Sequence, residues 1–170
     1  MLLLSASAQE LDKDSLYVAL RNVESPVERT KIFLNLSEYF LYKNNDSASF
    51  FMLKAKNSLL YQSSDLQYLE VDRLLGLVLR EHGRLDSAIA ILERSLDYIE
   101  NKMDQRQISQ DIILVKGTAL RDLSSLNRLK GSHAPALEYS LSALTIYDSL
   151  QKANPKDNLL RKSMGEQSTL

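Results

Sequence analysis

The chain has 170 residues, of which 44% are hydrophobic and 25% are charged, so it is long enough for one compact domain that buries roughly 70% of its unfolded surface. Its 21 basic and 22 acidic side chains give a net charge of −1, which provides no global field to attract nucleic acid or anionic lipid. The sequence contains no cysteine, which excludes disulfides, cysteine-ligated zinc and thiol catalysis. No apolar run approaches the roughly 20 residues of a membrane helix.

The first nine residues are typical of the end of a signal peptide. An apolar start, Met1 to Leu4, is followed by Ala6-Ser7-Ala8, the small-x-small pattern that signal peptidase accepts. The basic start and the longer apolar stretch of a whole signal are missing. The pattern therefore favours the remnant of a signal peptide and an exported, for example periplasmic, protein. The alternative is a frayed tail on a cytoplasmic protein.

From residue 10 onward, apolar residues recur at intervals of three and four, which predicts an all-α fold. Turn residues and capping signals divide this pattern into helices. Ser25 to Glu28 forms a capping box with Pro26 at the first helical position. The predicted helices cover about 11–23, 26–43, 46–61, 64–82, 86–101, 105–130 and 135–151.

Short turns between these helices make consecutive helices antiparallel neighbours. The sequence therefore predicts three helical hairpins, over about 26–62, 64–102 and 105–151, within a single domain that spans 10–170. The segment 155–170 is expected to act as a cap or a linker.

The hairpins also repeat in sequence. Asp46-Ser47-Ala48 recurs as Asp86-Ser87-Ala88, and the spacing of Gly83 and Ala88 recurs in Gly131 and Ala136. Such self-similarity is typical of stacked repeat proteins.

The middle hairpin carries Leu75-Gly76-x-x-Leu79 followed by Ala88-x-x-x-Leu92, which resembles the tetratricopeptide repeat (TPR) pattern of Leu-Gly-x-x-Tyr and Ala-x-x-x-Phe. The outer hairpins match less well, and Ser140 stands where a large residue is expected. The resemblance covers residues 26–151 and implies a right-handed TPR-like α-solenoid of about three hairpins with terminal helices. The repeat spacing exceeds the usual 34 residues, which leaves HEAT-like hairpins or an irregular bundle as alternatives.

Small residues in this pattern allow paired helices to approach closely, and larger apolar ones fill the adjoining space. The residues expected to pack the repeats are Ser37, Ala48, Leu75, Gly76, Ala88, Leu92, Ser124, Ala136 and Ala143.

The sequence offers little for catalysis or metal binding. The two histidines, His82 and His133, both fall in predicted turns, where a role at a helix end or in packing explains them best. There is no Gly-rich phosphate or dinucleotide loop and no calcium loop. We therefore expect a protein that is not an enzyme and needs no cofactor.

Arginines repeat on the predicted first helices of two hairpins. Arg73 and Arg80 lie seven residues apart, and Arg121 and Arg128 occupy equivalent places. The TPR resemblance implies that these helices line a concave groove in which basic and Asn side chains hold a partner's carboxylates. The expected groove residues are Lys31, Asn35, Tyr42, Arg73, Arg80, Arg121 and Arg128. The alternative is that the arginines pair with Glu70, Glu81 or Asp122 and only keep the surface soluble.

These patterns predict a non-catalytic scaffold that binds a peptide or protein with an acidic segment or a free C-terminus, and no nucleic acid. One alternative is an extracytoplasmic sensor or adaptor portion of a bacterial membrane-spanning regulator. Another is a self-associating repeat protein, such as a homodimer, because the uncovered end of a repeat array is apolar.

Overall fold

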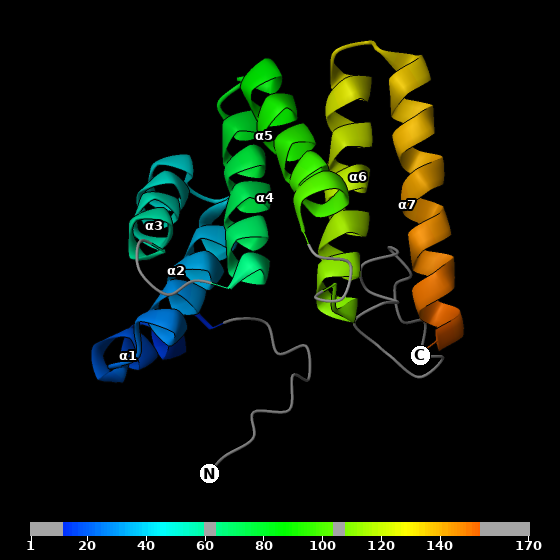
Figure 1. Ribbon diagram of the computed structural model, residues 1–170. Helices are drawn as coiled ribbons and strands as arrows, with labels where there is room; N and C mark the ends of the chain where they lie inside the picture. Colours follow the sequence, from blue (N-terminus) through cyan, green and yellow to red (C-terminus); the bar gives the residue numbers. More distant parts are fainter. Residues whose placement is uncertain (1–11, 60–63, 104–107, 154–170) are drawn as a thin grey trace, which may run out of the picture.

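The computed structural model describes residues 12–59, 64–103 and 108–153. Within these ranges the chain forms seven α-helices and no strand (Figure 1), so the all-α prediction is confirmed. None of the described helices combines the length and the apolar character that a membrane span requires. The predicted signal remnant at 1–9 and the segment 155–170 lie outside the described residues.

Each predicted helix is present, with ends that differ by a few residues. The helices are α1 (Lys13–Asn22), α2 (Pro26–Phe40), α3 (Asn45–Ser58), α4 (Asp65–Glu81), α5 (Leu85–Asp97), α6 (Gln110–Leu129) and α7 (His133–Ala153). A short π-helix, η1 (Tyr98–Lys102), continues α5.

Capping groups decide where the helices begin. The Ser25 hydroxyl accepts a hydrogen bond from the backbone amide of Glu28, as the capping box predicts. Helix α3 begins one residue before the predicted position because Asn44 caps it, with its side-chain oxygen 2.9 Å from the amide nitrogen of Ser47. Similarly, Ser109 caps α6, which starts at Gln110 instead of 105.

Consecutive helices pack in pairs: α2 with α3, α4 with α5, and α6 with α7. The turns inside the last two pairs contain Gly83 and Gly131, whose φ angles of 71° and 79° lie in the left-handed region that glycine tolerates. Helix α4 also contacts α2 and α6, so these three helices lie in a row across the molecule (Figure 1).

A small residue lies at a tight contact between the two helices of each pair. The Ser37 hydroxyl donates a 2.8 Å hydrogen bond to the carbonyl of Ala48, which ties α2 to α3. A Cβ on Gly76 would lie 3.1 Å from Leu92, and one on Gly117 would lie 3.0 Å from Ile146. Of the residues expected to pack the repeats, Leu75 is half-buried; the others, Ser37, Ala48, Gly76, Ala88, Leu92, Ser124, Ala136 and Ala143, are buried. Gly117 was not among the residues predicted from the sequence.

Ala88 offers a direct test of this packing, because it is 0% exposed and belongs to the core cluster between α5, α6 and α7. Ala88→Asp should lower the free energy of unfolding by at least about 3 kcal/mol, since it buries an unpaired carboxylate. Ala90→Asp, at an exposed position of the same helix, should cost no more than about 1 kcal/mol. Urea denaturation measures both, and equal losses would contradict the packing role of Ala88.

Candidate functional site

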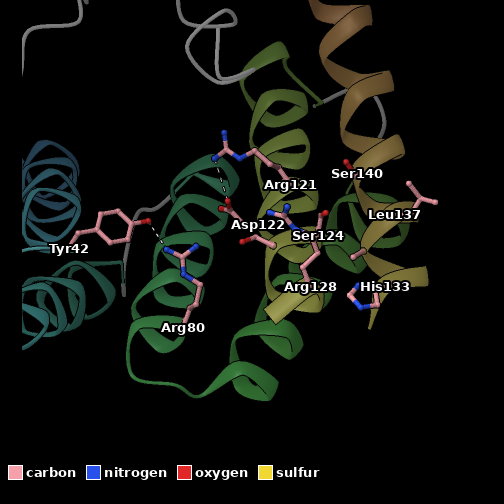
Figure 2. Close-up of a pocket in the computed structure, with 11 residues that line it drawn as sticks. Tyr42, Arg80, Arg121, Asp122, Ser124, Arg128, His133, Leu137 and Ser140 are labelled. Carbon is pink, nitrogen blue, oxygen red and sulfur yellow. Dashed lines mark hydrogen bonds and ion pairs between the residues drawn. The ribbon is translucent and has the colours of Figure 1, made fainter. Parts of the chain in front are cut away.

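A polar pocket of about 550 Å³ lies between α4, α6 and the start of α7 (Figure 2). Ala136 and Leu137 supply its apolar wall. Its polar lining comprises Tyr42, Arg80, Arg121, Asp122, Ser124, Ser125, Arg128, His133 and Ser140. Three guanidinium groups and four hydroxyl-bearing side chains therefore face a single carboxylate.

The helices place these groups for simple geometric reasons. Arg121 and Arg128 are separated by seven residues, or about two turns, so both side chains leave α6 on the same side. His133 is the first residue of α7, and the tight turn at Gly131 brings it beside Arg128 (Figure 2). Arg80 reaches the pocket from the last turn of α4.

Arg80 is held in place by two neighbours. Its guanidinium donates a 2.6 Å hydrogen bond to the hydroxyl of Tyr42, as Figure 2 shows, and forms a 2.9 Å ion pair with Glu81. Tyr42 follows the end of α2 and is 69% exposed. These contacts fix the position of the guanidinium before any ligand binds.

Asp122 is the acidic group of the pocket, and its side chain is only 8% exposed. Arg73 lies 3.3 Å from one carboxylate oxygen, and Arg121 lies 3.4 Å from the other. Arg73 also approaches Glu38 on α2, at 3.9 Å. Arg73 therefore connects three helices and does not line the pocket.

Arg128 differs from the other arginines. Its side chain is exposed, and across the described ranges it has no hydrogen bond or ion pair with the protein. Because the carboxylate of Asp122 is already shared by two arginines, the pocket has an excess of positive charge around Arg128.

The pocket thus collects four of the seven expected groove residues: Tyr42, Arg80, Arg121 and Arg128. Lys31 is exposed on α2 and Asn35 is half-buried, and neither lines the pocket. The ion pairs of Arg73, Arg80 and Arg121 match the alternative interpretation, in which these side chains are paired within the protein.

His133 and the serines of the pocket were not among the groove residues predicted from the sequence. One signal was present: Ser140 occupies a position where the TPR pattern calls for a large residue, and it lies on the pocket wall. A larger side chain there would fill part of the space in front of Arg121 and Arg128.

The one serine–histidine contact recorded for the described residues, between α3 and the end of α4, does not resemble an activated nucleophile. The Ser49 hydroxyl lies 2.8 Å from Nε2 of His82 and also donates a 2.8 Å hydrogen bond to the carbonyl of Asn45. Because a hydroxyl has one proton, a Ser49 hydroxyl that donates to the carbonyl of Asn45 accepts from His82 and is not activated by it. No group of three or more His, Asp or Glu side chains in the described residues is placed to hold a metal ion.

Comparison with known proteins found no family model, no curated protein and no solved structure that match this chain.

Glu70, on α4, is a half-buried carboxylate that does not line the pocket. Burial raises the pKa of the Glu70 carboxyl above its ordinary value of 4.5, and the nearby charges of Lys31 and Arg73 oppose this shift without cancelling it. The folded protein therefore holds this proton to a higher pH than the unfolded chain. The free energy of unfolding therefore falls as the pH rises from the pKa of Glu70 in the unfolded chain through its higher pKa in the folded protein.

Glu70→Gln removes that ionisation. Below about pH 4 the variant and the wild-type protein should be equally stable, and the variant should become the more stable of the two as the pH rises to 7. Thermal melts across this range measure the difference. Glu24→Gln, at an exposed position between α1 and α2, is the control and should not reproduce the gain. A variant that loses stability at pH 7 would show that the attraction of Lys31 and Arg73 for the Glu70 carboxylate outweighs the cost of its burial.

Proposed function

We propose that this protein is a non-catalytic interaction domain that binds an acidic segment of a partner protein in the pocket between α4, α6 and α7. The observation that carries the proposal is Arg128, an exposed guanidinium without a protein partner in the described ranges, beside Arg80 and Arg121. Asp122, the carboxylate of the pocket, is already neutralised by Arg73 and Arg121.

The chemistry of the pocket suits carboxylates. A guanidinium group can donate two parallel hydrogen bonds to a carboxylate, and such charge-assisted bonds are about twice as strong as neutral ones. The serine hydroxyls can donate further hydrogen bonds to the ligand. The apolar wall of Ala136 and Leu137 offers contact to an adjoining aliphatic side chain. An acidic peptide segment or a free C-terminus provides both kinds of group.

We further propose that the fold is a right-handed TPR-like array of three hairpins. The pairing of α2 with α3, α4 with α5 and α6 with α7 supports this, as does the row formed by α2, α4 and α6. In a TPR-like array the first helices of the hairpins face the groove, and here α4 and α6 supply all three arginines of the pocket.

A random peptide library with free C-termini tests the acidic ligand. The wild-type protein should enrich peptides rich in Asp and Glu, and their affinity should fall as salt is added. Arg121→Ala combined with Arg128→Ala should weaken binding of the enriched peptide about tenfold or more, because charge-assisted hydrogen bonds are lost. It should also flatten the salt dependence measured by fluorescence anisotropy.

Arg84→Ala is the matched control, since Arg84 is exposed in the turn between α4 and α5 and lies outside the pocket. It should leave the affinity unchanged. Enrichment without acidic residues, or equal binding by the double variant, would refute the proposed ligand.

A further inference from the structure

Three leucines on one side of α7 are exposed to solvent. Leu137, Leu141 and Leu144 have 61%, 55% and 51% of their surface accessible. Their spacing of four and three residues aligns them in one stripe along the helix. An aligned apolar stripe on a helix surface indicates a contact with another helix.

The rest of α7 shows that this stripe is distinct from the core. The side of α7 that faces α6 carries Ala136, Ala143, Tyr147 and Leu150, which are all buried. The opposite exposed positions, Glu138, Ser142, Thr145 and Ser149, are polar. The exposed surface of α7 is therefore divided into a polar flank and a leucine flank, defined as Leu137, Leu141 and Leu144.

The two ends of the leucine flank carry different polar groups. His133 lies one turn before Leu137, beside Arg128 (Figure 2). Asp148 lies one turn after Leu144, and it is exposed with no hydrogen bond or ion pair inside the described ranges. Lys152 lies a further turn along, beyond the leucines. The flank thus runs from an imidazole, which can donate a hydrogen bond, through an apolar centre to a carboxylate, which can accept one.

We propose that the leucine flank is a dimer interface on which a second copy of this chain packs its own α7 in the antiparallel direction. A two-fold axis between positions 140 and 141 places Leu137 opposite Leu144 of the second copy and brings the two Leu141 side chains together. The same axis places His133 opposite Asp148 of the second copy. A surface with a hydrogen-bond donor at one end, an apolar centre and a carboxylate at the other end is complementary to itself in this orientation. A parallel pairing would instead set Asp148 against its own copy, which places two like charges together.

Sedimentation velocity of the full chain across micromolar concentrations tests the dimer. The wild-type mass should rise from one chain to two, and Leu141→Asp should raise the dissociation constant at least about tenfold, because it places like charges in the apolar centre. Thr145→Asp, which puts the same charge on the polar flank of the same helix, should dimerise like the wild type. Leu141 does not line the pocket, whereas Leu137 and His133 do, so this variant alters the dimer contact without removing a pocket residue.

Single cysteines test the orientation, since the sequence contains none of its own. Leu141→Cys should form a disulfide between two copies under mild oxidation. Leu137→Cys should not, because seven residues separate it from the facing position, about 10 Å along the helix axis, and a disulfide needs Cα atoms about 4.4–6.8 Å apart.

A wild-type protein that stays monomeric at every concentration would overturn the proposal. Coverage of the leucine flank by residues 154–170 of the same chain, or by a different protein, would give that result. Equal cross-linking of the two cysteine variants would overturn the antiparallel orientation.

Discussion

The close approach of the helices within each pair is the constraint on which the rest of the structure depends. Each pair meets at a residue with little or no side chain: Ser37 against Ala48, Gly76 against Leu92, and Gly117 against Ile146 and Tyr147. Interiors pack at the density of organic crystals, so helices held apart by even one methyl group would lose part of their contacts with their neighbours. The pairs in turn pack beside one another, with α4 in contact with both α2 and α6 in their row.

This arrangement gives the arginines different environments. Arg73 lies where α4 faces α6, close enough to pair with Asp122, and its side chain is largely buried. Arg80 forms an ion pair with Glu81, and Arg121 forms one with Asp122. Arg128, near the end of α6, lies beyond the reach of these carboxylates. Burial and pairing therefore assign Arg73 to holding helices together and leave Arg128 without a partner among the described residues.

The sequence predicted the helices well because their signals are local. Apolar periodicity located all seven, and side chains beside several of the starts, such as Ser25 and Ser64, supplied the caps. The repeat pattern also pointed to the buried small residues Ala48, Gly76 and Ala88. These features depend on neighbours along the chain.

The site was harder to predict because it depends on distances between helices. Spacing along one helix places Arg73 and Arg80 on the same side, but it does not show that Arg73 alone reaches a carboxylate on α6. Gly117 was not predicted as a packing residue because its contact with Ile146 has no counterpart in the TPR pattern. His133 belongs to the pocket only because the turn at Gly131 directs the start of α7 toward Arg128.

The central claim is that Arg128 and Arg121 meet an acidic ligand while Arg73 holds the fold. The most direct measurement is an NMR titration of the arginine side-chain Nε–Hε signals with the most enriched library peptide. The signals of Arg121 and Arg128 should shift as the peptide saturates the protein, and those of Arg73 and Arg84 should stay in place. Shifts that are equal for all arginines, or confined to arginines outside the pocket, would contradict the account.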